Sequence, residues 1–217
     1  SQEIYQKGNK MALDTEEEQV EKIQNIWNSY KWVIILVIIA LLGIYFAYNF
    51  YSDQKVKNTA QASQLYQEIL ITKLTDIDSI TEKVALLKKV SSNTPYASRS
   101  SIYLSKLYSQ DNNNEAAIKE LIWASENTPE ESIKSMANYL LANIYLVTDK
   151  FDDAMMAAVK IDTIGFQTLT KDIIGDIYLK QDNKKEARKS YIEALQLYKG
   201  QGDIRKVIQN KIDSIGQ

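Results

Sequence analysis

A long apolar run divides the chain into two unlike parts. The 20 residues 32–51 contain no charged side chain, and a helix of this length spans about 30 Å, which matches the hydrocarbon core of a bilayer. Aromatic side chains, which favour the membrane interfaces, gather at both ends of the run: Trp27, Tyr30, Trp32, Tyr45, Phe46, Tyr48, Phe50 and Tyr51. The pattern predicts one transmembrane helix, with a buried core helix as the alternative.

The leader, residues 1–31, indicates that this helix is kept as an anchor. A cleaved signal peptide has a basic start, an apolar region of about 7–15 residues and a small-residue cleavage site. The leader instead holds four lysines against six acidic residues, and no Ala-x-Ala motif follows the apolar run. Lys22 and Lys31 before the run balance Lys55 and Lys57 after it, so the positive-inside rule does not fix the orientation.

Apolar side chains in the leader recur on one face of a helix. Val20, Ile23, Trp27 and Tyr30 are spaced three or four residues apart, which is typical of an amphipathic helix. The polar face is acidic, and this opposes attraction to anionic lipid. The helix is expected either to lie at the membrane interface or to form a docking strip for another membrane protein.

Residues 52–217 have the length of one domain and an apolar periodicity of three and four, which predicts helices throughout. The tripeptide Asn-Thr-Pro occurs at 93–95 and again at 127–129. Each copy predicts a helix start in which Thr caps the helix and Pro takes the first helical position. Capping boxes are also predicted, at Thr128/Glu131, Ser79/Glu82 and Thr15/Glu18.

The two prolines are 34 residues apart, which is the period of tetratricopeptide repeats, each a pair of helices. Polar turns at 111–114, 148–150 and 181–184 stand at corresponding places between the helices of three units. The small and aromatic signature positions of these units are occupied by Ser105, Tyr108, Ala117, Leu121, Ala124 and Pro129, then Ala142, Tyr145, Ala154, Ala158 and Ile161, then Gly175, Tyr178, Ala187, Tyr191 and Ala194.

A degenerate first unit and a last helix complete the predicted stack. The pair 56–71 and 79–92 has a longer connection, and its first helix is a candidate to continue the transmembrane helix outward. An apolar stripe after Gly202 suits a helix that caps the stack: Ile204, Val207, Ile208, Ile212 and Ile215. The expected fold class is all-α, with one N-terminal transmembrane helix followed by a tetratricopeptide-repeat α-solenoid of about seven helices, including a C-terminal capping helix.

Protein recognition is expected on the concave face, which the first helices of the units form. The lining is mixed and lacks the Lys/Asn/Arg combination with which some tetratricopeptide domains bind a terminal carboxylate. A broad, adaptable protein surface is therefore predicted rather than one sequence-specific peptide pocket. The residues that the repeat places on this face are Arg99, Ile102, Lys106, Met136, Tyr139, Asn143, Leu169, Asp172 and Asp176.

Composition argues against enzymatic chemistry. The chain has no His and no Cys, which excludes a Cys/His zinc site, a Cys nucleophile and a Ser-His-Asp triad. Ser52 and Lys55 fit a Ser-x-x-Lys spacing without a companion motif, and 76–78 reads as a solvated linker because it lacks the glycine and glutamate of a calcium loop. After Tyr51 the chain has 22 basic and 22 acidic residues, so nucleic acid is not an expected partner. We expect no catalytic residues, cofactor or metal.

Several short motifs stand in a fixed order from the leader to the last helix. They are Glu-Glu-Gln-Val-Glu at 17–21, Asn93-Thr94 with Tyr96-Ala97, Ile-Asp-Thr-Ile at 161–164, Gly175-Asp176, Asn-Lys-Lys-Glu-Ala-Arg at 183–188 and Lys211-Ile212. With one span before a tetratricopeptide domain, this order resembles the YfgM-like ancillary subunits of the bacterial SecYEG translocon. The resemblance covers nearly all of the sequence after Asp14.

The resemblance implies a protein of the bacterial inner membrane, with residues 1–31 in the cytoplasm, 32–51 in the bilayer and 52–217 in the periplasm. Its implied partners are the SecYEG translocon, a PpiD-like membrane-anchored chaperone, exported client proteins and membrane lipid. Its implied function is non-enzymatic, helping newly exported proteins to reach periplasmic chaperones. The alternative is a membrane-anchored tetratricopeptide scaffold for an envelope or cell-division complex.

Overall fold

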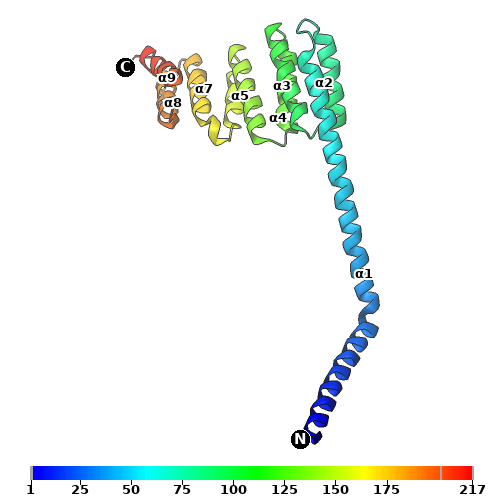
Figure 1. The fold of residues 1–217 in the computed structure, drawn as a ribbon. Coiled ribbons are helices and arrows are strands. Elements are labelled where there is room, and N and C mark those ends of the chain that lie inside the picture. Colours follow the sequence, from blue (N-terminus) through cyan, green and yellow to red (C-terminus); the bar gives the residue numbers. More distant parts are fainter. Residues whose placement is uncertain (1, 201, 217) are drawn as a thin grey trace. The chain divides into compact units, whose positions relative to one another are not determined.

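The computed structural model describes the backbone of residues 2–200 and 202–216, and within these ranges the side chains from Val20 onward. In this part of the chain every regular element is a helix, as Figure 1 shows. The all-α prediction is therefore confirmed. The chain divides into two compact units, Ser1–Val56 and Lys57–Gln217.

The first unit belongs to one long helix, α1 (Gln2–Ile71). The sequence predicted a leader helix that starts at a Thr15 capping box, but the backbone is helical on both sides of Thr15, so no helix starts there. The side chains of Thr15 and Glu18 lie outside the described residues. No proline precedes Pro95, so no proline interrupts the backbone hydrogen bonds of α1.

The apolar run inside α1 is not covered by protein. Trp32 is 72% exposed and Leu36 is 67% exposed, and the apolar stretch that meets the length of a membrane span is wholly unburied. A core helix of a soluble protein would be covered on at least one face, so the buried-helix alternative is wrong. Within the described residues, α1 is the one helix long and apolar enough to cross a membrane.

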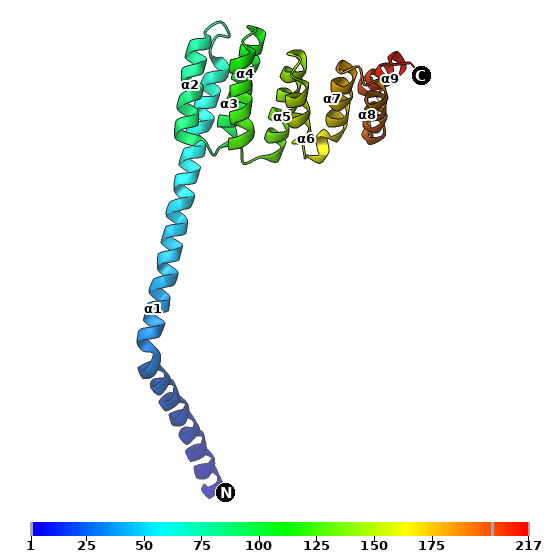
Figure 2. The same cartoon turned by 180° about the vertical axis from the view of Figure 1, so that it is seen from behind.

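The helices of the second unit follow one another as packed pairs, which Figure 1 shows from one side and Figure 2 from behind. A 3₁₀ turn, η1 (Ile164–Phe166), precedes the last pair. The end of α1 and eight further α-helices make up this part of the described chain. The sequence predicted about seven helices, and the number is larger because both helices of the degenerate first pair are formed. The helices are α2 (Ile77–Ser91), α3 (Pro95–Gln110), α4 (Asn114–Asn127), α5 (Glu131–Val147), α6 (Phe151–Val159), α7 (Gln167–Lys180), α8 (Lys184–Leu197) and α9 (Asp203–Ser214).

The three turns predicted as polar loops share one backbone geometry. Asn112, Asp149 and Asp182 have left-handed φ values of 58°, 57° and 59°, a region that Asn and Asp tolerate better than other non-glycine residues. The amide of the following residue then donates to a carbonyl five residues back, at 2.8–2.9 Å, as in a Schellman motif. The accepting residues are the signature tyrosines Tyr108, Tyr145 and Tyr178.

The residue after each left-handed position is also the N-cap of the second helix. The side chain of Asn113 accepts a hydrogen bond from the amide of Ala116 at 3.2 Å, and that of Asn183 accepts one from Glu186 at 3.4 Å. Lys150 holds the same place before α6 and provides no side-chain cap. The middle unit therefore lacks a hydrogen bond that its two neighbours have.

The first Asn-Thr-Pro copy starts a helix as predicted, but with a different hydrogen bond. Pro95 takes the first position of α3, after Thr94 at the N-cap. The Thr94 hydroxyl donates to the carbonyl of Ser91 at 2.8 Å instead of accepting from the new helix. Thr94 is buried, so its hydroxyl closes the preceding turn.

The second copy does not start a helix where the sequence predicted. Helix α5 begins at Glu131, after Glu130 at the N-cap, so Pro129 and the Thr128/Glu131 box lie outside the first turn. Thr128 has an extended backbone, as residues before proline favour, and its hydroxyl accepts from the amide of Glu130 at 3.2 Å. This local turn delays the helix by two residues.

Helix α2 begins with a different cap from the one that the sequence predicted. Asp76 is the N-cap, and its carboxylate accepts a hydrogen bond from the amide of Ser79 at 3.2 Å. Ser79 therefore lies inside the first turn, and the predicted Ser79/Glu82 capping box is wrong. Asp76, expected to be part of a solvated linker, is the residue that caps the helix.

The last helix covers the end of the stack, though with fewer residues than predicted. Ile208 and Ile212 are buried against Ala187, Tyr191 and Ala194 of α8, and Ile215 packs beside them. Ile204 and Val207 are 46% and 52% exposed, so they do not belong to the buried stripe. Helix α9 therefore caps the stack as predicted, but through Ile208, Ile212 and Ile215 alone.

Candidate functional site

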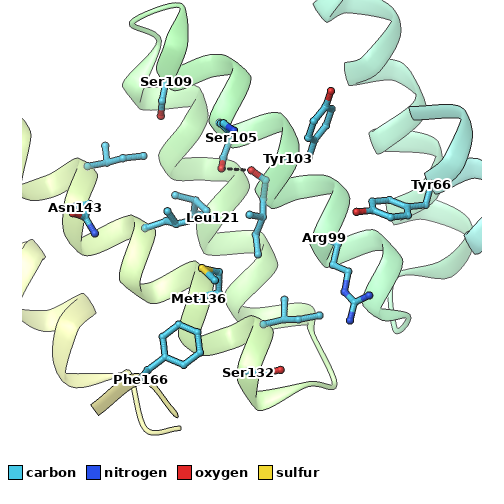
Figure 3. Close-up of a pocket in the computed structure, with 15 residues that line it drawn as sticks. Tyr66, Arg99, Tyr103, Ser105, Ser109, Leu121, Ser132, Met136, Asn143 and Phe166 are labelled. Atoms are coloured by element: carbon cyan, nitrogen blue, oxygen red, sulfur yellow. Dashed lines mark hydrogen bonds between the residues drawn. The ribbon is translucent and has the colours of Figure 1, made fainter. Parts of the chain in front are cut away.

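An apolar groove of about 610 Å³ crosses the first helices of the second unit. Figure 3 shows its lining, with residues from α1, α3, α4, α5 and η1 around one space. The lining residues are Tyr66, Arg99, Ile102, Tyr103, Ser105, Lys106, Ser109, Leu121, Ser132, Ile133, Met136, Leu140, Asn143, Ile144 and Phe166. The volume lies within the range of about 300–1,000 Å³ that is usual for binding sites.

Helical periodicity explains why α3 and α5 supply most of this lining. On α3 the lining residues recur at spacings of three or four, from Arg99 to Ser109, and on α5 they do so from Ser132 to Ile144. Residues with this spacing share one face of a helix. The two helices stand at equivalent places in successive repeats, so their inward faces border the same groove.

The sequence predicted nine residues on this face, and five of them line the groove: Arg99, Ile102, Lys106, Met136 and Asn143. Tyr139 is partly buried and packs against the core of the middle repeats. Leu169 is also partly buried and is not among the lining residues of this groove. Their binding role stays a prediction.

Two residues of the lining come from segments that sequence reasoning did not place there. Tyr66 lies near the end of α1, and Phe166 lies in η1, next to Met136 in the view of Figure 3. The degenerate first unit gave no repeat position for Tyr66. Phe166 lies in the short 3₁₀ turn between α6 and α7, and its large aromatic side chain was the available signal.

The charge of the lining is entirely positive. Its two charged side chains are those of Arg99 and Lys106, and it contains no carboxylate. Arg99 forms an ion pair with Glu130 at 3.2 Å, in which the two side chains are 47% and 38% exposed. Exposed pairs of this kind contribute roughly 0–1 kcal/mol, so Arg99 can exchange Glu130 for another anion.

The predicted acidic residues Asp172 and Asp176 lie in a separate cluster that α9 completes. Lys211 donates to both carboxylates of this pair, at 2.8–2.9 Å. The hydroxyl of Tyr191 donates to Asp176 at 2.6 Å, and the Lys211 ammonium lies 5.3 Å from the centre of the Tyr191 ring. Both acids therefore have hydrogen-bond partners within the domain, and Lys211 offsets one of their two negative charges.

Burial and charge shift the pKa values in this cluster. Burial raises the pKa of Asp172 above its usual value, although Lys211 opposes the shift. Burial, then the hydrogen bond to Asp176, raise the pKa of the Tyr191 hydroxyl well above its usual value. Burial disfavours the charge of Lys211, but its hydrogen bonds to Asp172 and Asp176 outweigh burial, and its pKa is raised.

The leader strip is open to its surroundings. Val20, Ile23, Trp27 and Tyr30 are 52–67% exposed. Ile26 is exposed as well, at 58%, so apolar side chains extend beyond the predicted face. Among the side chains that the structure describes, no group of three or more acidic residues could hold a metal ion.

A span-length exposed helix, a stack of paired helices and an apolar groove define a membrane-anchored helical-repeat protein. The profile of the tetratricopeptide repeat-like domain family matches residues 24–217, and the chain belongs to this family. The repeat pattern inferred from the sequence is thus confirmed.

Relatives that carry the name ancillary SecYEG translocon subunit are similar to the chain over most of its length. The protein of Neisseria gonorrhoeae is 26% identical, over 94% of this chain and 100% of its own length. The proteins of Aggregatibacter actinomycetemcomitans and Escherichia coli are 25% and 24% identical, over 85% and 82% of this chain and 91% and 86% of their own lengths. The resemblance to the YfgM-like ancillary subunits is therefore confirmed. No solved structure is significantly similar to the chain.

Proposed function

We propose that the chain is a non-enzymatic, protein-binding subunit that is anchored in the bacterial inner membrane beside the SecYEG translocon. Its relatives are named for that association and are similar along nearly the whole chain. The observation that carries the proposal is the apolar groove of about 610 Å³ in a repeat domain that follows a membrane-spanning helix. An apolar groove of this kind is suited to recognising exposed apolar segments of other proteins.

In this proposal the leader lies in the cytoplasm and the second unit lies in the periplasm. There the domain binds newly exported proteins and helps to pass them to periplasmic chaperones, among them a PpiD-like membrane-anchored chaperone. Anchoring replaces intrinsic affinity, because a tethered site meets its ligand at an effective concentration on the order of millimolar. A weak, fast-releasing groove is then sufficient for transfer from one protein to the next.

Photocrosslinking in intact cells tests the proposal. A photoreactive residue is placed in turn at Trp27 in the leader, at Lys106 and Met136 in the groove, and at Lys180, an exposed lysine outside it. We expect translocon adducts from Trp27, and adducts with exported chains or periplasmic chaperones from the two groove positions but not from Lys180.

Two outcomes would overturn the proposal. Cytoplasmic partners at Lys106 and Met136 would reverse the orientation of the second unit. A single envelope or cell-division protein at both groove positions, with no translocon adduct from Trp27, would replace the proposed function by that of a scaffold.

A further inference from the structure

We propose that the groove binds one amphipathic helix of a partner protein, with the apolar face of that helix against α3 and α5 and its acidic side chains beside Arg99 and Lys106. The inference rests on the proposed function only in taking the groove as a binding surface. It adds the conformation and the charge of the ligand.

The charge of the ligand follows from the charged groups around the groove. Lys106 is exposed and has no ion-pair partner among the described residues, and Arg99 has only the exposed partner Glu130. The two acidic residues that the repeat pattern placed on this face, Asp172 and Asp176, are held by Lys211. The groove therefore attracts a ligand that carries carboxylates and repels one that carries amines.

The conformation of the ligand follows from the lining of the groove, where Ser105 and Asn143 already use their donors within their own helices. Ser105 already donates its hydroxyl to the carbonyl of Ile102 at 2.7 Å, and Asn143 donates its amide to the carbonyl of Tyr139 at 2.8 Å. An extended peptide would bury backbone groups without partners, at a cost of about 1–3 kcal/mol each. A helix satisfies its own backbone, so only its side chains need to fit.

The length of the groove matches a short helix. The lining of α3 runs from Arg99 to Ser109, a helical distance of about 15 Å, which equals about ten residues or three turns of a bound helix. Such a helix presents anchors at positions i, i+3, i+4 and i+7 to the groove. Met136, at 40% exposure, supplies a flexible side chain that adapts to different anchors.

Peptide binding to the full chain in lipid nanodiscs tests the inference. Three fluorescent peptides are compared by anisotropy: an amphipathic helix of Leu and Glu, the same helix with Lys in place of Glu, and the Glu peptide with a central Pro that breaks the helix. We expect the Glu helix to bind about tenfold more tightly than either of the others.

Variants of the chain assign the binding to the groove. Met136→Glu places a charge on the apolar floor and is expected to weaken the Glu helix about tenfold. Lys106→Glu is expected to weaken the Glu helix about fivefold and to strengthen the Lys helix. Lys119→Glu, at an exposed position of α4 outside the groove, is the matched control and should leave both affinities unchanged. Circular dichroism of each variant verifies that it folds.

Equal affinities for the Glu and Lys helices, or tight binding of the Pro peptide, would overturn the inference. The same conclusion follows if Lys119→Glu weakens binding as much as Lys106→Glu. Failure of the proposed function can be distinguished from failure of this inference by comparing the peptide and crosslinking results. If peptide binding is as expected but the cellular crosslinks to the translocon are missing, the proposed function alone fails. If the crosslinks are present but no peptide discriminates, only the helix inference fails.

Discussion

In the last repeat, the ring of Tyr191 fills the space where a side chain at residue 175 would stand. A Cβ added to Gly175 would lie 2.4 Å from Cε1 and 2.5 Å from Cδ1 of that ring. The corresponding pair in the first clear repeat is Ser105 with Leu121. There a residue larger than Gly175 is paired with one smaller than Tyr191. The two positions therefore share a fixed space between the paired helices.

The substitution Gly175→Ala is expected to destabilise the second unit by about 1–3 kcal/mol, because the Tyr191 ring is buried and cannot withdraw. Urea unfolding followed by circular dichroism measures the change. Gly165→Ala is the matched control, since nothing lies within 4 Å of a Cβ added there. The double variant Gly175→Ser with Tyr191→Leu copies the Ser105/Leu121 pair and should regain only part of the loss, because it removes the clash but also the Tyr191–Asp176 hydrogen bond. A Gly175→Ala variant as stable as Gly165→Ala would show that the steric argument is wrong.

The turn before α6 offers a stabilising substitution. Asn113 and Asn183 cap the second helices of their units, whereas Lys150 does not. Lys150→Asn is expected to add about 0.5–2 kcal/mol to the unfolding free energy, and Asn113→Ala to remove a similar amount. Thermal unfolding of the two variants beside the parent chain measures both changes. The capping argument would be contradicted if either variant left the stability unchanged.

At the scale of elements, α9 is held to α7 by an ionic contact as well as by its apolar face. Lys211 and Tyr191 have pKa values raised above their ordinary values of 10.5 and 10.0. A group whose pKa is raised by folding stabilises the folded state below its unfolded pKa and loses that contribution as the pH rises through the folded value. Lys211 and Tyr191 therefore contribute stability at neutral pH that is lost under alkaline conditions, while the raised pKa of the partly buried Asp172 opposes part of this contribution at neutral pH.

The unfolding free energy is accordingly expected to fall as the pH rises above about 10, with α9 separating first. Tyr191→Phe removes one of the two groups, so its stability should fall less steeply over the same pH range. Urea unfolding at several pH values measures the slopes, with Tyr103→Phe as the matched control. An unchanged slope in Tyr191→Phe would contradict the assigned role of this hydroxyl.

The apolar run of α1 should tolerate no charge at its centre. Leu41 is 61% exposed within this run, so it would face lipid. Leu41→Arg is expected to cost about 2.5–3.5 kcal/mol of membrane insertion, and carbonate extraction of membranes then measures a larger soluble fraction. Leu74→Arg, at an exposed residue after α1, should leave extraction unchanged. Equal resistance of both variants to extraction would argue against a spanning segment.

At the scale of the whole molecule, the repeat pattern made much of the fold predictable. Paired helices, their turns and five groove residues follow from a period of 34, because neighbouring contacts in a repeat are local and recur at fixed positions. The start of α5 was mispredicted because the Asn-Thr-Pro tripeptide starts a helix directly at 93–95, whereas at 127–129 it forms a turn that comes before the helix. The contacts of Lys211, 35 and 39 residues from its partners, carry no sequence signal at any local spacing.

The combination of span and groove in one chain leads to a last prediction. A specific protease site inserted at 52–56, between the apolar run and the second unit, would allow the domain to be released in place. Release should leave the affinity of the groove for the Glu helix unchanged, because the groove lies wholly in the second unit. Crosslinks from Met136 to exported chains in cells should nevertheless fall about 10²-fold or more, since the effective concentration that anchoring provides is lost.

The two readouts together separate tethering from intrinsic affinity. Uncleaved chain that carries the inserted site is the control, and the released domain must first bind the Glu helix with the parent affinity to show that it stays folded. Crosslinks that persist after release would mean that the groove finds its partners by affinity alone. The membrane helix would then serve only for localisation, and the weak, fast-releasing groove of the proposed function would have to be replaced by a tight one.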